Sequence, residues 1–309
     1  RALGAYWVAA MSDGRVFPLI EVSRDELTAL VGAPIQAIAR VDGGLTNTIH
    51  KVTLEKGDVL AVKHYAGGKD AFEAELVTLT LLHGTLPVPD VVHADAEHHV
   101  IVYRWIDGIT LNDCRKAEGP AAASLAEPLG RLMAWLARTD ATEPYELTPI
   151  LERAYRQLVD GRARQRLGAP LADAIRHTIE SAEPQLAWGT VCLVHGDLGG
   201  RNVIVQRAAP ERWRISGVID WEATSTGSPL IDIGSLFRYS SQFDPQFRGA
   251  FERGYREADG TLPEGWLLTS RILDATWLID TLDEPREFPG VYADCRMLLA
   301  TLAKDAGVG

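Results

Sequence analysis

One segment decides how the rest of this chain is interpreted: His195-Gly196-Asp197-Leu198-Gly199-Gly200-Arg201-Asn202, followed by Val218-Ile219-Asp220-Trp221-Glu222. Phosphoryl transfer from a nucleotide needs a carboxylate that orients or deprotonates the acceptor hydroxyl, and oxygen ligands that hold Mg²⁺ against the phosphates. Asp197 and Asn202, five residues apart, have the spacing of such a loop, and Asp220 follows on the next predicted strand. An isolated His-x-Asp would indicate only a polar surface turn, but the complete set predicts a nucleotide-dependent phosphotransferase.

Apolar runs around these residues predict the local structure that carries them. Residues 191–194 predict a short buried strand that leads into the loop. Residues 203–205 and 215–219 predict a hairpin that ends at Asp220. The loop and the hairpin would together deliver the polar side chains to one site.

These motifs, with Gly217-Val218-Ile219 before Asp220, Gly227-Ser228-Pro229 and Asp232-Ile233-Gly234, resemble the aminoglycoside phosphotransferase family. That family has a protein-kinase-like fold and includes choline, methylthioribose and homoserine kinase relatives. The resemblance covers nearly all of the chain from about Ile35 onward. It implies an α+β, bilobal protein: an N-terminal antiparallel sheet with one key helix, a larger, mainly helical C-terminal lobe, and nucleotide in the cleft.

The resemblance also implies roles by position. Asp197 would be the catalytic base, Asn202 and Asp220 would bind Mg²⁺, and His195 would support the loop. Asp232 would accept hydrogen bonds from the backbone of the catalytic loop. One departure is Gly199-Gly200-Arg201, where many members carry a His-Pro-Gly-like run, and this puts only the local shape of the loop in doubt.

A glycine-rich loop is the candidate cover for the nucleotide phosphates. Gly43, Gly44, Thr46 and Asn47 lie between two predicted strands, and glycine lets backbone amides approach phosphate oxygens closely. The loop is similar to the Gly-Gly-x-Thr-Asn loop of choline-kinase-like relatives, although an ordinary hairpin turn remains open. A Walker loop is excluded, because Gly68-Lys69 would need a glycine at position 63, which is Lys63.

Lys63 lies in the predicted strand 59–65, where a kinase carries the lysine that holds the α- and β-phosphates. Such a lysine needs an acidic partner on the following helix, predicted over 71–83, and we prefer Glu75 to Glu73 because Glu75 flanks the face directed at the sheet. Residues 102–106, which include Tyr103 and Trp105, would form the hinge that holds a purine through backbone groups. An ordinary buried strand is the alternative there.

Acidic residues near the C-terminus are the candidate acceptor site. Glu222 lies two residues after Asp220, the second predicted metal ligand. Asp280, Asp283 and Glu284 lie on one face of a predicted helix. In the family, acidic side chains of the helical lobe bind cationic acceptors, which suggests the same role here. A solvated helix face is the equally weighted alternative.

Composition restricts the class of protein. The 309 residues carry a formal net charge of −11, which argues against nucleic acid as a partner because phosphate backbones are bound through clustered Lys and Arg. No run approaches the roughly 18–20 apolar residues of a membrane span. Three widely spaced cysteines fit a reduced, cytoplasmic protein.

The hydrophobic pattern divides the chain into three parts: an extension with a short helix over 1–34, a nucleotide-binding lobe over 35–106, and a catalytic and acceptor-binding lobe over 107–309. Ser23 and Glu26 form the capping-box pattern of a helix over 23–31. Strands are predicted over 36–41, 48–54, 59–65, 91–94 and 100–105. Further helices are predicted around 129–136 and over 150–159, 171–182, 245–255, 267–282 and 294–304.

The sequence therefore predicts a cytoplasmic O-phosphotransferase that uses Mg²⁺ and ATP or GTP and acts as a monomer or homodimer, with no nucleic-acid or membrane partner. The expected acceptor is a cationic small molecule, an aminoglycoside or another amine-bearing antibiotic, which would make the protein a resistance enzyme. The alternative is a metabolic kinase for choline, methylthioribose or a sugar. A pseudokinase that serves as an interaction module is disfavoured, because Lys63, Asp197, Asn202 and Asp220 are all present.

Overall fold

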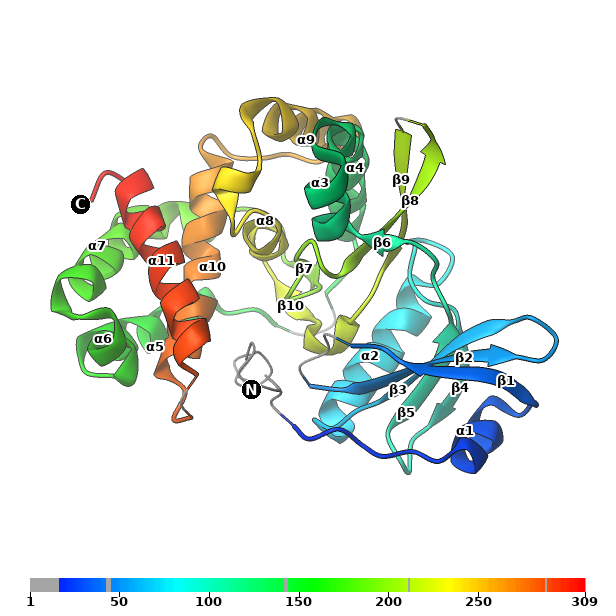
Figure 1. Ribbon diagram of the computed structural model, residues 1–309. Helices are drawn as coiled ribbons and strands as arrows, with labels where there is room; N and C mark the ends of the chain where they lie inside the picture. The colour runs from blue at the N-terminus through cyan, green and yellow to red at the C-terminus, as the bar shows by residue number, and fades with distance from the viewer. Residues whose placement is uncertain (1–16, 43–45, 142–143, 211, 287, 309) are drawn as a thin grey trace.

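The structure is a computed structural model that describes residues 17–42, 46–141, 144–210, 212–286 and 288–308. Two lobes are visible in Figure 1: a small one around a twisted sheet, and a larger one made mainly of helices. The predicted α+β, bilobal organisation is confirmed. The division of the chain at Ile106 remains a prediction. Among the described helices, none combines the length and the apolar character that crossing a bilayer requires.

The small lobe begins with helix α1 (Arg24–Val31), which starts where the capping-box pattern predicts. The Ser23 hydroxyl accepts a hydrogen bond from the Glu26 amide at 3.2 Å, and the Glu26 carboxylate accepts one from the Ser23 amide at 2.7 Å. Gly32 ends the helix in the left-handed conformation, with φ of 65°.

Five antiparallel strands form the sheet of the small lobe, in the order β1-β2-β3-β5-β4. Their bounds are β1 Ile35–Arg40, β2 Thr48–Leu54, β3 Val59–His64, β4 Val91–Asp95 and β5 Val100–Arg104. All five lie within a residue of the predicted strands. Helix α2 (Lys69–Leu82) connects β3 to β4.

Side chains alternate between the two faces of strand β3, and this alternation positions the lysine. Leu60 and Val62 belong to an apolar cluster with Leu27 of α1. Ala61 belongs to the cluster on the opposite face, with Phe72 of α2. Lys63, two residues after Ala61, therefore points to the α2 side of the sheet.

The large lobe contains the remaining elements, with two small sheets, β6-β8-β9 and β7-β10, set among helices. Their bounds are β6 Ile109–Thr110, α3 Leu111–Glu118, η1 Gly119–Leu125, α4 Ala126–Leu136, α5 Leu147–Val159, α6 Arg162–Leu167, α7 Ala169–Leu186, β7 Cys192–Val194, β8 Val203–Ala209, β9 Arg212–Val218, η2 Trp221–Ala223, β10 Ser225–Gly227, α8 Leu230–Leu236, η3 Ser240–Gln242, α9 Pro245–Glu257, α10 Trp266–Asp283 and α11 Pro289–Asp305. The predicted long helices and the β8–β9 hairpin are present. The short elements β6, β10, α3, α6 and α8 were not predicted, because so few residues show little periodicity.

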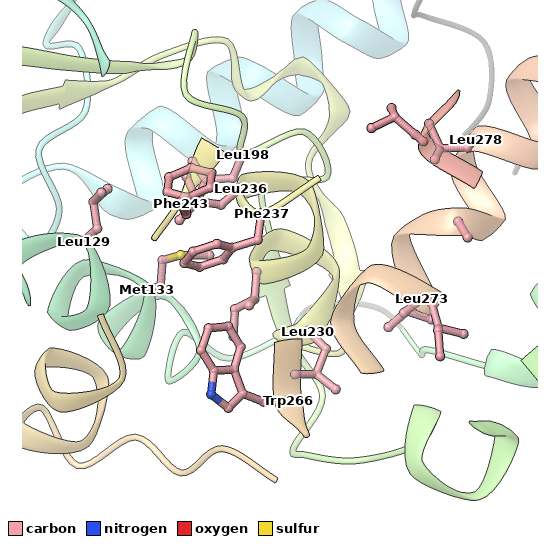
Figure 2. Packing of buried hydrophobic residues seen from close by; sticks show 14 of the residues in the cluster. Leu129, Met133, Leu198, Leu230, Leu236, Phe237, Phe243, Trp266, Leu273 and Leu278 are labelled. Carbon is pink, nitrogen blue, oxygen red and sulfur yellow. The ribbon is translucent and has the colours of Figure 1, made fainter. Parts of the chain in front are cut away.

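Helix α10 crosses the large lobe and is buried along most of its length. Figure 2 shows Phe237, Phe243 and Trp266 packed together with Leu230 and Leu236 beside them. Helix α8 approaches α10 so closely that a Cβ at Gly234 would collide with the backbone oxygen of Ser270. This contact fixes α8, and with it Asp232, directly behind the segment that follows β7.

Candidate active site

Asp232 anchors the loop that leaves β7. Its carboxylate accepts hydrogen bonds from the backbone amides of His195, at 2.8 Å, and Gly196, at 3.0 Å. The predicted bracing of this loop is confirmed. Burial raises the pKa of Asp232 to about 6, although His195 and the two backbone hydrogen bonds act in the opposite direction. Gly196 has φ of 79°, and a Cβ there would collide with the carbonyl of Ala223. Only glycine therefore lets the backbone of this loop lie so close to the backbone of η2.

His195 joins the loop to the strand and turn that follow it. Its Nε2 lies 3.0 Å from the carbonyl oxygen of Ile219, and its Nδ1 accepts from the Asp197 amide at 3.3 Å. The ring also packs against Trp221, with centroids 4.5 Å apart. Nε2 is therefore the protonated nitrogen, and the imidazole fixes Asp197 relative to Asp220.

Asp197 is buried, and only one of its carboxylate oxygens is used within the loop. Oδ2 accepts from the Asn202 amide group at 2.8 Å and from the Arg201 guanidinium at 3.1 Å. Burial raises the pKa of Asp197, and the charge of Arg201 opposes this shift. Oδ1 accepts no hydrogen bond from the described residues, so it is available to an acceptor hydroxyl.

Asn202 and Asp220 present oxygen atoms beside Asp197. Both hydrogens of the Asn202 amide group are donated to Asp197, to its carbonyl oxygen at 2.9 Å and to Oδ2, which leaves Oδ1 as a potential ligand. Asp220 has φ of 70° and ψ of 56°, the left-handed conformation, in which aspartate is one of the less disfavoured residues. A strained backbone of this kind is retained where the surrounding structure fixes the side chain.

Lys63 is fully buried among three carboxylates. Its Nζ lies 2.5 Å from Glu75, 2.6 Å from Asp220 and 3.6 Å from Glu222. Burial alone would lower the pKa of Lys63, but Asp220 and Glu75 raise it well above its usual value. The predicted pairing with Glu75 is present, whereas Glu73 pairs with Lys69 on the exposed face of α2.

The three carboxylates around Lys63 also make a potential cation site. Single oxygen atoms of Glu75, Asp220 and Glu222 lie within 4.8 Å of one another. Burial raises the pKa of Glu222 to about 7, with Lys63 opposing the shift and Asp220 and Glu75 adding to it. The site therefore carries more negative charge than one lysine neutralises.

The candidate phosphate loop contacts the large lobe directly. The Asn47 amide group donates a hydrogen bond to the Glu222 carboxylate, and Thr46 and Asn47 are both buried. Gly43 and Gly44 lie outside the described residues. Asn47, predicted to face phosphates, therefore uses its side-chain amide group to join the two lobes.

The candidate hinge follows β5. Tyr103 is buried and pairs with Ala61 of β3. The amide of Trp105 donates to the carbonyl of Val59 at 3.0 Å, so it is already used within the sheet. The next amide, that of Ile106, donates to no group in the described part of the chain.

A cavity of about 140 Å³ opens next to Gly196, between η2 and helices α5 and α10. Glu222 and Asp280 both line it, as predicted for the acceptor site. Asp283 does not, because its carboxylate accepts a hydrogen bond from the Ala163 amide at the start of α6, at 3.0 Å. Glu284 ends α10 outside the cavity, so the structure brings together only two of the four predicted acceptor residues.

Arginine partners of these carboxylates were missed by the sequence analysis. Arg153 binds Asp280 through two hydrogen bonds of 2.9 and 2.7 Å, and Arg238 binds Asp274 through two of 2.9 and 2.8 Å. The arginines lie far from their partners in sequence, so spacing gives no signal for them. The sequence did hold a signal that could have predicted the cavity wall. Leu273, Trp277 and Asp280 are spaced so that they share one face of α10.

Comparisons with known proteins agree with this geometry. The model of the phosphotransferase enzyme family (APH) matches residues 37–266. Choline kinase LicA from Streptococcus pneumoniae has a similar structure, with a TM-score of 0.67, 17% identity, and coverage of 91% of this chain and 97% of that one. A thermostable mutant of aminoglycoside phosphotransferase APH(4)-Ia gives a TM-score of 0.65, 18% identity, and coverage of 92% and 97%.

Macrolide 2'-phosphotransferase MphH from Brachybacterium faecium is also similar, with a TM-score of 0.60, 19% identity, and coverage of 91% and 95%. At these identities the solved structures establish the protein-kinase-like fold, which the resemblance predicted. The family model spans most of the chain and both lobes. The protein therefore belongs to the phosphotransferase enzyme family and is a small-molecule phosphotransferase.

Proposed function

We propose that the protein transfers the γ-phosphoryl group of ATP or GTP to a hydroxyl of a small molecule, with Mg²⁺ as cofactor. The observation that carries this proposal is the ion pair between Lys63 of the small lobe and Asp220 of the large lobe, beside the loop in which Asn202 binds Asp197. The similar APH(4)-Ia structure is a ternary complex with AMP-PNP and hygromycin B, which supports a nucleotide donor and a small-molecule acceptor.

The residues present fit a magnesium ion. Mg²⁺ prefers oxygen ligands, and the Asn202 carboxamide and the Asp220 carboxylate supply them. The excess of carboxylates over lysine around Asp220 also favours a divalent cation. When bound there, the ion would neutralise charge on the phosphates.

On the donor side, Lys63 would hold the α- and β-phosphates while Glu75 fixes the position of its ammonium group. The Thr46 and Asn47 segment and the glycines before it would cover the phosphates. A purine would be held at the hinge through the Ile106 amide rather than the Trp105 amide, since the latter is bound to Val59.

On the acceptor side, Asp197 would accept a hydrogen bond from the reacting hydroxyl through its Oδ1 atom. The hydroxyl oxygen would then attack the γ-phosphorus, the bond from that phosphorus to the β–γ bridging oxygen would break to release the nucleoside diphosphate, and the hydroxyl proton would pass to Asp197. Arg201 and Asn202 hold the other carboxylate oxygen, so the reacting oxygen keeps a fixed direction.

We further propose that the acceptor is an amine-bearing antibiotic and that the reaction takes place in the cytoplasm, with the protein as a monomer or homodimer and without a nucleic-acid partner. The Glu222 carboxylate in the cavity wall supports this choice of acceptor, because a carboxylate can pair with an amine. A second candidate is a metabolic kinase for a small amine such as choline, because the aromatic rings of Tyr145 and Trp277 in the cavity wall suit a quaternary ammonium group.

The test is acceptor-stimulated release of ADP or GDP in the presence of Mg²⁺. The acceptors are aminoglycosides, macrolides, peptide antibiotics, choline and methylthioribose, and the Asp197→Ala variant is the control for chemistry at this site. We expect one acceptor class to raise nucleotide turnover in the wild-type protein only. Nucleotide binding without any acceptor-dependent turnover would contradict the proposal and favour the pseudokinase alternative.

A further inference from the structure

The carboxylates of the acceptor cavity are largely neutralised by the protein itself. Asp280 is held by both nitrogens of the Arg153 guanidinium and by the Gln157 amide group, at 2.8 Å. Asp274 is held in the same way by Arg238, and the Asp274 side chain is buried. Two of the cavity's three carboxylates are thus paired with arginine.

Glu222 is the remaining carboxylate of the cavity. It lies 3.6 Å from the Lys63 ammonium and accepts a hydrogen bond from Asn47. The cavity therefore offers one partly compensated negative charge to an incoming ligand. Arg153 itself lines the wall, with 30% of its side chain exposed, and would repel further amines.

Apart from Thr224, Ser225 and Thr276, the rest of the wall is mainly apolar and aromatic. Ile150, Ile231 and Leu273 line it, together with the rings of Tyr145 and Trp277. The Trp277 ring is held by the Arg238 guanidinium, 4.3 Å from the ring centroid. An apolar surface of this kind binds a ligand by removing the ligand's apolar surface from water.

The size of the cavity and the Tyr145 hydroxyl restrict the ligand further. An apolar cavity of about 150 Å³ accommodates a six-membered ring such as benzene, and this cavity has a similar volume of about 140 Å³. The hydroxyl of Tyr145 is buried and has no hydrogen-bond partner among the described residues. It can therefore bond to an uncharged polar group of the ligand.

From these features we infer that the acceptor is an amphipathic hydroxy compound with a single amine, such as a macrolactone that bears one amino sugar, and not a polycationic aminoglycoside. This inference rests on the proposed function. One ring of the acceptor enters the cavity with its hydroxyl toward Gly196 and Asp197. Its apolar body lies against the Trp277 side of the wall, and its amine faces Glu222.

The first experiment compares acceptors under changing salt. We expect macrolides to give a KM at least about tenfold below that of aminoglycosides, and choline, which has no apolar body, to bind weakly. The macrolide KM should change by less than about twofold between 0.15 M and 1 M salt, where the Debye length falls from about 8 to about 3 Å. Aminoglycosides or choline as the better acceptors, or a KM that rises steeply with salt, would overturn the inference and leave phosphotransferase activity standing.

The second experiment changes the wall. Trp277→Ala should raise the macrolide KM by about tenfold and leave the nucleotide KM unchanged. Because Trp277 also contacts Arg238, Ile150→Ala provides a second variant that disturbs no ion pair, with an expected rise of about threefold. Unchanged acceptor KM values in both variants would contradict the inference.

The third experiment removes the protein's own counterion. Arg153→Met leaves Asp280 unpaired at the wall, so an aminoglycoside should become a better acceptor by about tenfold while the macrolide loses little. Arg176→Met is the matched control, since Arg176 pairs with Glu180 on the surface of α7. No gain for aminoglycosides in the properly folded variant would count against the charge argument. Failure of every acceptor to raise nucleotide turnover in the wild type would instead refute the proposed function.

Discussion

The nucleotide side and the acceptor side of this active site use charge in opposite ways. On the nucleotide side, three carboxylates converge on the single ammonium of Lys63 and leave oxygen atoms for a cation. On the acceptor side, Asp274 and Asp280 each have an arginine of their own. An acidic residue near a cleft therefore indicates a cationic ligand only after its partners in the fold are known.

Removing the Asp197 carboxylate, which lies where the two sides meet, is expected to have the largest effect of all. Asp197→Ala deletes the group that contacts the acceptor hydroxyl, and loss of general-base catalysis costs about 10²–10⁴ in rate. Nucleotide affinity should stay within a few-fold, since Lys63 and Asp220 remain. Single-turnover rates and a nucleotide titration measure the two quantities, and near wild-type turnover would refute the assignment.

Asp220→Asn comes next. An uncharged amide is a poorer ligand for Mg²⁺ than a carboxylate, so affinity for Mg-nucleotide should fall by at least about tenfold. Affinity for nucleotide without Mg²⁺ should change less. Calorimetric titrations with and without the metal test this, with Asp58→Asn, a partly exposed carboxylate of the other lobe, as the control. Equal losses in both titrations would place the metal elsewhere.

Asp232→Asn tests the support beneath the catalytic loop. An amide has one oxygen, so one of the two backbone amides at His195 and Gly196 loses its acceptor, at a cost of about 1–3 kcal/mol of unfolding free energy. Urea unfolding of the two proteins measures this difference. Equal stability would show that the hydrogen bonds contribute little.

The same variant should also change the pH dependence of stability. The pKa of Asp232 is raised by burial from 3.8 to about 6, so the folded protein keeps the proton on this carboxyl up to a higher pH than the unfolded chain does. The contribution of Asp232 to stability is therefore full below about pH 4 and is lost as the pH rises through about 6. Unfolding curves across this range should show a smaller slope for Asp232→Asn, and identical slopes would contradict the shift.

The smallest effect is expected on the acceptor side. Asp283→Ala removes the acceptor for the Ala163 amide at the start of α6, which should cost about 1 kcal/mol, as for other helix caps. Because Asp283 lies outside the cavity, the acceptor KM should not change. A raised acceptor KM at unchanged stability would restore Asp283 to the binding site and weaken the contrast between the two sides.

Short-range patterns were sufficient to predict much of the nucleotide side. The five-residue spacing of Asp197 and Asn202 predicted which side chains meet in the catalytic loop, and Glu75 was preferred from its place on a helical face. Ser23 and Glu26 likewise specified the start of α1 through local hydrogen bonds. In each case, the chemistry depends on neighbours that the sequence places close together.

The acceptor side depends on contacts between distant parts of the chain. Arg153 and Asp280 are separated by 127 residues, and Asn47 and Glu222 by 175. Asp283 shares a helix with Asp280, yet the packing of α6 directs it to a backbone amide. No periodicity reveals such partners, so the charge available to a ligand could not be predicted there.

The hydrogen bond between Asn47 and Glu222 has a consequence for how the two substrates influence each other. Asn47 belongs to the loop expected over the donor, and Glu222 lines the acceptor cavity. Any ligand that changes the strength of this bond also changes the free energy of the other site. By thermodynamic linkage, the factor by which donor alters acceptor affinity must equal the factor by which acceptor alters donor affinity. The Asn47–Glu222 contact thus couples the affinities of the two substrates to each other.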